Sequence, residues 1–154
     1  MSFIATANPP LAADDAQVNN DPWFPAVDVK RARDVCRLDG TVTPPRLAHA
    51  IEAAMDTVNA ELRAYQAAQQ AAGVQTLQDA GDGRQAGRYL RAIYAHVQAD
   101  LAEAYRDIDV TPQSAGKTER VTDKIELKIG EHRRNLRWAI SDLLGIRRTT
   151  VDLV

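Results

Sequence analysis

Apolar residues recur at steps of three and four over three long stretches of this chain, a spacing that predicts amphipathic helices. The first stretch follows Thr43, an N-cap candidate before two prolines, and it ends at Gly73. Its apolar positions are Leu47, Ile51, Ala54, Val58, Leu62 and Tyr65. The second stretch runs from about Gln85 or Gly87 to Ile108, with Leu90, Ile93, Val97, Leu101 and Ala104 on its inner face.

The third stretch runs from Lys117 to Leu144 and stops at Gly145, as expected when glycine takes the first left-handed position past a helix. Its inner positions are Val121, Ile125, Ile129, His132, Leu136, Ala139, Ile140 and Leu143. Gly130 interrupts this pattern, so we expect a kink or a close helix contact there. A fourth, shorter helix is predicted over about Val27 to Leu38, capped by Asp28, with Val29, Ala32, Val35 and Cys36 along one side.

The two ends of the chain lack helical periodicity. Residues 1–22 combine prolines, asparagines and small residues, which predicts an extended arm, with Trp23 as its apolar anchor. Residues 146–154 are rich in threonine and β-branched residues, which favour a strand. This tail could be loose, as termini often are, or it could dock on another surface. The sequence therefore predicts an all-α bundle of about four helices at 23–145, between an arm and a tail.

Composition supports close helix packing around a thin core. Of the 154 residues 45% are hydrophobic, but 26 residues are alanine and only 5% are aromatic. No apolar run approaches the length of a membrane span, and the N-terminus has no secretory signal, so we expect a soluble intracellular protein. One cysteine, Cys36, excludes an internal disulfide and a cysteine-built zinc site.

The net charge of −2 is unevenly distributed. Residues 1–116 carry 10 basic and 15 acidic side chains, whereas residues 117–154 carry 9 and 6. The basic end could be a solvated helix face, a surface for an acidic partner or, less simply, a surface for DNA phosphate. The basic residues that recur along the last helix, and that could form a phosphate-facing stripe, are Lys117, Arg120, Lys124, Lys128 and Arg137.

No motif for catalysis, cofactor binding or a metal centre is present. The sequence has no HExxH, G-x-S-x-G or phosphate-binding glycine loop. His49, His96 and His132 are far apart, and none belongs to the Glu-x-x-His pattern of a di-metal bundle. We therefore expect no enzyme activity, no cofactor and no metal, and surface or interface roles for the histidines.

Several segments nevertheless resemble a known family. Arg137-Trp138-Ala139-Ile140-Ser141-Asp142-Leu143 and Arg147-Arg148-Thr149-Thr150-Val151 match most strongly, with Trp23-Phe24-Pro25-Ala26-Val27-Asp28 and Arg88-Tyr89-Leu90-Arg91 earlier in the chain. Over residues 23–154 the sequence resembles the head completion (GPL) family of contractile-tailed temperate phages. The segment 78–86 is shorter than the resemblance leads us to expect.

The resemblance implies a structural protein of the virion, located at the head–tail junction and present in the host cytoplasm during assembly. Such proteins are similar to head–tail connector adaptors, helical subunits that form a dodecameric ring under the portal protein. The ring helps to retain packaged DNA, which passes through without sequence-specific binding, and it offers a platform to the neck or tail-joining protein. No membrane is involved.

Within that framework we expect the tail to dock on the portal or on a neighbouring subunit. Arg147 and Arg148 would be its charged anchors and Val151 and Leu153 its apolar ones. Trp138 would set the position of the tail, or it is an ordinary core tryptophan. The loop at 74–86 would face the next neck component. The competing hypothesis is a helical DNA-binding packaging factor, similar to a small terminase, that uses the basic stripe.

Overall fold

The computed structural model describes residues 16–109 and 115–147, including the side chains of 16–105 and 123–147. The elements in chain order are β1 (Gln17–Val18), β2 (Val27–Asp28), α1 (Val29–Cys36), α2 (Pro44–Ala71), the 3-10 turn η1 (Leu77–Asp79), α3 (Gln85–Asp109) and α4 (Ala115–Leu144). The predicted all-α class with four helices is confirmed.

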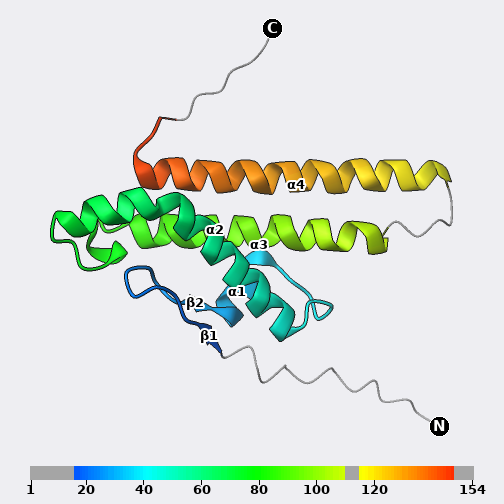
Figure 1. Ribbon diagram of the computed structural model, residues 1–154. Coiled ribbons are helices and arrows are strands. Elements are labelled where there is room, and N and C mark those ends of the chain that lie inside the picture. The colour runs from blue at the N-terminus through cyan, green and yellow to red at the C-terminus, as the bar shows by residue number, and fades with distance from the viewer. Residues whose placement is uncertain (1–15, 110–114, 148–154) are drawn as a thin grey trace, which may run out of the picture.

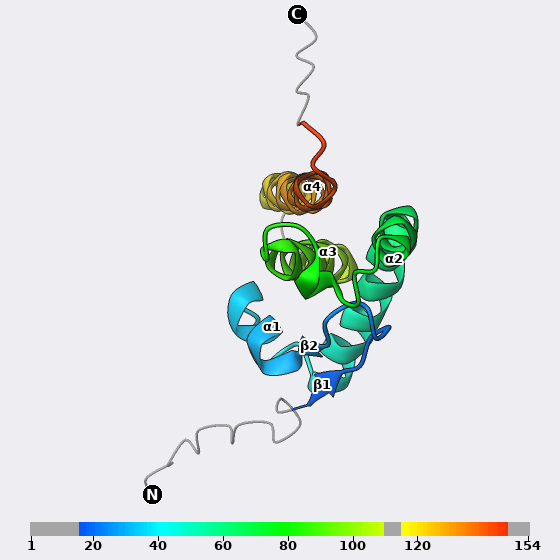
Figure 2. The same cartoon turned by 90° about the vertical axis from the view of Figure 1, so that its left-hand side faces the viewer.

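Helix α3 lies at the centre of the molecule. Figure 1 shows α3 and α4 side by side along their length, with α2 crossing α3 obliquely. In the view of Figure 2, α4 covers one side of α3, while α1 and α2 lie on the other side and diverge from each other. Because α3 contacts α1, α2 and α4, it fixes how these helices are oriented relative to one another.

Helix ends follow the predicted capping signals. The Asp28 carboxylate accepts a hydrogen bond of 2.6 Å from the backbone N–H of Arg31 at the start of α1. Gly145 has a φ of 68°, and the N–H of Ile146 donates to the carbonyl of Ser141 at 2.9 Å, which is the six-to-one bond of a Schellman motif. The predicted end of α4 at Gly145 is therefore confirmed.

The expected disturbance at Gly130 is absent. Helix α4 continues through this position, and it is straight in Figure 1. Gly130 is exposed, and a Cβ atom built on it would have no neighbour within 4 Å outside its own helix. Neither a kink nor a close helix contact explains this glycine.

The core is built largely from the predicted apolar positions. On α2 the buried positions include Leu47, Ile51, Val58 and Leu62, and α3 and α4 contribute a further set: Ile93, Val97, Leu101, Ile129, Ala139, Ile140 and Leu143. Two predicted inward residues are exposed instead. Val35 is 53% exposed because α1 is only eight residues long and buries one narrow stripe of Val29, Ala32 and Cys36. Ala104 is exposed near the far end of α3.

A two-stranded antiparallel sheet, which the helical pattern did not predict, connects residues 16–22 to the helices. Val18 pairs with Val27, and the side chain of Asn20 is half-buried. The Asn20 Nδ2 donates to the hydroxyl of Tyr89 at 2.8 Å and to the carbonyl of Pro25 at 3.0 Å. The Tyr89 hydroxyl donates to Asn59 Oδ1 at 2.7 Å, and Asn59 Nδ2 donates to Asn20 Oδ1 at 2.9 Å. This part of the predicted arm thus packs on the helical domain.

Candidate docking surface at the end of α4

Polar contacts from α3 hold the last turns of α4 in place. Gln85, which is 7% exposed, donates from Nε2 to the carbonyl of Leu143 and to the hydroxyl of Tyr65, both at 3.2 Å. Arg91 of α3 forms an ion pair with Asp142 of α4. The first contact satisfies a carbonyl that the helix itself leaves without a partner, so the end of α4 has a defined position.

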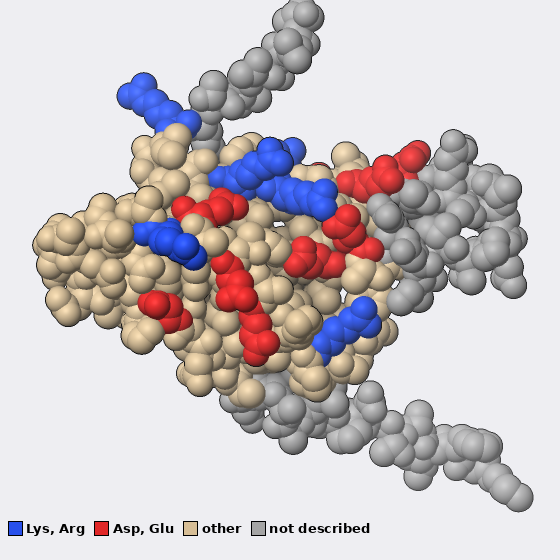
Figure 3. All heavy atoms as spheres, in the orientation of Figure 1, with Lys and Arg blue, Asp and Glu red and all other residues tan. Residues whose placement is uncertain are grey.

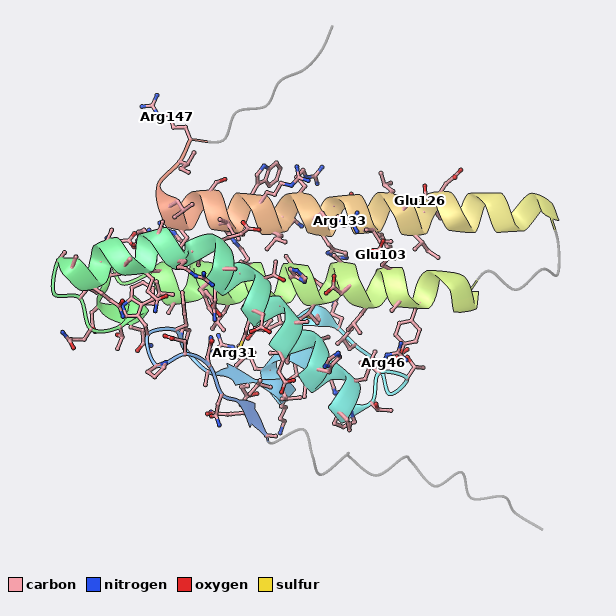
Figure 4. All side chains as sticks on the ribbon, viewed as in Figure 1. Arg31, Arg46, Glu103, Glu126, Arg133 and Arg147 are labelled. Atoms are coloured by element: carbon pink, nitrogen blue, oxygen red, sulfur yellow. The ribbon has the colours of Figure 1, made fainter. Side chains whose placement is uncertain are left out.

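Beyond this fixed end the chain turns away from the helices. Ile146 is 58% exposed, although it is a large apolar residue, and Arg147 is exposed beside it. Figure 4 shows Arg147 extending outward, away from α3 and α4. The other tail residues that we predicted to make contacts, Arg148, Val151 and Leu153, lie outside the described residues.

Trp138 lies on the surface of α4 and not in the core. It is 37% exposed, and the Arg134 guanidinium carbon lies 4.9 Å from the centroid of its ring. Arg133, next to Arg134, forms an ion pair with Glu103 of α3 at 2.6 Å (Figure 4). The alternative that Trp138 is an ordinary core tryptophan is therefore wrong.

Trp138 borders a groove of about 470 Å³ between α1, α3 and α4. Val35 of α1 and Leu90 and Tyr94 of α3 are the large apolar side chains that share this groove with it. The sequence pattern missed the groove because it placed Val35 in the core. The presence of Trp138 was a sequence signal that could have pointed to it, since tryptophan is enriched at interfaces.

Trp23 is a core residue with an exposed fraction of 2%. Its ring packs edge-on against Phe24 at 4.9 Å between centroids, and its carbonyl accepts a hydrogen bond of 2.8 Å from the N–H of Leu77. Trp23 thus fixes the loop after α2. Residues 1–15, the rest of the predicted arm, lie outside the described residues.

The predicted basic stripe does not form one face of α4. Lys124 and Lys128 are exposed four residues apart, but Arg137 comes nine residues after Lys128. In a continuous helix nine residues are two and a half turns, so Arg137 lies on the opposite side. Among the described side chains the two lysines alternate with the exposed acids Asp123, Glu126 and Glu131. The side chains of Lys117 and Arg120 lie outside the described residues.

A second hollow, of about 410 Å³, brings together Cys36 and His132, a pair of residue types that can form a nucleophile and its base. Burial raises the pKa of the Cys36 thiol to about 11, so the sulfur stays protonated. Burial also lowers the pKa of His132, which favours the neutral imidazole. This combination does not generate the thiolate that nucleophilic catalysis needs.

The remaining histidines have one acidic neighbour each. His49 Nδ1 lies 4.0 Å from Glu52, and His96 Nδ1 lies 3.0 Å from Asp100. Among the described side chains, those of residues 16–105 and 123–147, no three His, Cys, Asp or Glu residues gather closely enough to hold a metal ion. In the same part of the chain, no helix has both the length and the apolar character that crossing a membrane requires.

Comparison with known proteins agrees with the resemblance found in the sequence. The model of the family described as phage head completion protein (GPL) matches residues 18–154. The head completion/stabilization protein of Escherichia phage P2 is 35% identical over 152 residues, covering 95% of this chain and 88% of that protein. No solved structure matches.

Proposed function

The chain belongs to the phage head completion (GPL) family and is a structural component of the virion that completes the head, and we propose that it acts there as a connector adaptor. In this proposal copies of the chain form a ring beneath the portal protein at the head–tail junction. The ring helps to retain the packaged DNA and serves as a platform for the neck or tail-joining protein. Assembly takes place in the host cytoplasm.

The observation that carries this proposal is the way the chain leaves α4. A capped helix end, held by Gln85 and by the Arg91–Asp142 ion pair, presents an exposed apolar residue, Ile146, followed by exposed Arg147. In an isolated subunit, an exposed isoleucine at the start of a β-prone tail does not contribute to the stability of the fold. A partner that binds the tail as an added β-strand would cover these residues. The backbone of the tail and that of the partner's strand would then form hydrogen bonds with each other.

The described hollows support a structural role and not a catalytic one. The Cys36 thiol is protonated and buried, and the groove beside Trp138 contains no acidic or nucleophilic group other than the phenol of Tyr94. We accordingly propose that the protein is not an enzyme and that it acts by binding other virion proteins.

Replacement of the tail tests the adaptor function. Residues 147–154 are exchanged for a glycine–serine segment of the same length, which keeps the N–H of Ile146 that closes the α4 cap. Binding to the purified portal ring is measured by light-scattering mass, and helicity by circular dichroism. We expect normal helicity and loss of the portal-bound species; a variant that still binds the portal in full would refute docking through the tail.

The competing hypothesis of a DNA-binding packaging factor has less support, because Lys128 and Arg137 lie on opposite sides of α4. The distinguishing measurement is DNA binding at micromolar protein concentration as a function of salt. Salt-sensitive binding that is lost in Lys124→Ala/Lys128→Ala would favour the packaging factor over the adaptor.

A further inference from the structure

The groove beside Trp138 has the surface chemistry of a binding site. It is lined mainly by apolar atoms, and it leaves Trp138 and Val35 37% and 53% exposed. The side chains that line the groove come from α1, α3 and α4. In a monomer such a patch exposes apolar area to water with no compensation, whereas a partner would bury it.

Charge defines what the groove could accept. The Tyr94 side chain is 8% exposed and its hydroxyl is buried, so this phenol forms part of the wall and is out of reach of a docked partner. Two arginines, Arg31 and Arg91, line the same groove, which contains no acidic side chain. Arg91 is shared with Asp142 outside the lining, so Arg31 is the principal source of positive charge. A negatively charged group next to small or apolar side chains would therefore complement both Arg31 and the apolar lining.

The chain carries a surface of this kind on α2. Glu52, Asp56 and Ala60 follow one another at four-residue steps and are all exposed. Figure 3 shows acidic side chains gathered over α2 and α3 on the face turned to the viewer. Alanine at the third position lets another molecule approach the helix backbone closely.

The two surfaces lie on opposite sides of the molecule. The groove is lined by α1, α3 and α4, and Figure 2 shows α1 toward the left and α2 toward the right of the molecule. A contact between unlike surfaces on opposite sides repeats from one subunit to the next, and it closes into a ring when the rotation permits. A contact between two like grooves would instead end at a dimer.

We propose that the groove of Val35, Tyr94 and Trp138 in one subunit receives the acidic face of α2, at Glu52, Asp56 and Ala60, from a second copy of this chain. This inference rests on the proposed ring and names the surfaces that build it. Val35 and Trp138 supply the apolar contact, and Arg31 meets the carboxylates. The tail beyond Gly145 remains available for another partner.

The direct test is site-specific photo-crosslinking in assembled phage heads. A benzophenone amino acid replaces Val35, an exposed position whose change leaves the core intact. We expect a product of twice the subunit mass, in which the probe is joined to the tryptic peptide 47–63 of α2. The same probe at Asp56 should label the peptide 138–147, which contains Trp138.

The outcomes separate this inference from the proposed function. A protein that is absent from the heads would refute both. The protein could instead be present in the heads with the probe at position 35 joined to the portal protein or to residues 146–154 of another copy, or without any crosslink. Each of these results would refute the groove contact and leave the adaptor function standing.

Charge reversal gives an independent measurement with a matched control. Glu52→Lys/Asp56→Lys changes two exposed acids of the proposed surface, and Asp123→Lys/Glu126→Lys changes two exposed acids of α4 outside it. Both variants should keep the circular dichroism spectrum of the parent. We expect the first to reduce the number of copies per head at least tenfold and the second to leave it unchanged. Full incorporation of the α2 variant would contradict the proposal.

Discussion

Replacing Tyr89 by phenylalanine removes one oxygen atom from the centre of the polar network that joins residues 16–22 to α2 and α3. Tyr89 has no exposed surface, and burial, the largest influence on it, raises the pKa of its phenol. The hydroxyl accepts from Asn20 at 2.8 Å and donates to Asn59 at 2.7 Å. At a net value of about 1 kcal/mol for each hydrogen bond, the free energy of unfolding should fall by about 2 kcal/mol. For a chain of this size that corresponds to a decrease in Tm of about 4–8 °C.

The assay is urea denaturation followed by circular dichroism, with Tyr65→Phe as the control. The Tyr65 hydroxyl accepts one bond, at 3.2 Å, from Gln85, which keeps its second bond to Leu143, so the control should lose less than about 1 kcal/mol. A loss of less than about 0.5 kcal/mol in Tyr89→Phe would show that the network does not stabilise the fold. The double variant with Asn20→Ala should lose less than the sum of the two single changes, since both remove the same hydrogen bond.

Three other substitutions and one labelling experiment test individual parts of the structure. Gly130→Ala should raise the free energy of unfolding by about 1 kcal/mol, because the helix there is regular and the added Cβ has no neighbour within 4 Å. Gly145→Ala should lower it by about 1 kcal/mol, because the φ of Gly145 is 68°. Urea denaturation measures both effects. The Cys36 thiol, with a pKa of about 11, should resist alkylation by iodoacetamide at pH 8 in the folded protein and react on unfolding, and rapid labelling of the native protein would contradict its burial. The pKa of His132 is lower in the folded than in the unfolded protein. Its contribution to the free energy of unfolding should therefore be fully present above the unfolded pKa of about 6.5 and be lost as the pH falls below that value. We expect the stability of His132→Gln to depend less on pH than that of the parent between pH 7.5 and the folded pKa.

The long helices were predictable because their signals are local. The period of apolar residues and the stops at Gly73 and Gly145 do not depend on what each helix packs against. Helix α1 lies within the predicted range of Val27 to Leu38 and is two residues shorter at each end, since Val27 and Asp28 form β2. Of its predicted inner face, Val29, Ala32 and Cys36 are buried and Val35 is not. Over only eight residues, one exposed valine is enough to blur the pattern, and the buried stripe is set by contact with α2 and α3.

The groove and the polar network share one physical reason why the sequence did not predict them. Both depend on residues brought together from distant parts of the chain, such as Asn20 and Tyr89 or Val35 and Trp138, which no local pattern relates. The basic stripe failed for a different reason. Helical steps between neighbouring residues were satisfied up to Lys128, but the interval to Arg137 is half a turn out of phase.

The position of α3 links stability to the proposed assembly. A ring closes only if every subunit presents its two contact surfaces at the same angle. One proposed surface lies on α1, α3 and α4 and the other on α2, and α3 contacts all of these helices. The angle between the surfaces is therefore set by the packing around α3, to which Tyr89 contributes without lying on either surface. A loss of assembly in Tyr89→Phe, at a temperature where the subunit remains folded, would indicate that the geometry of the subunit, in addition to its contacts, determines ring closure.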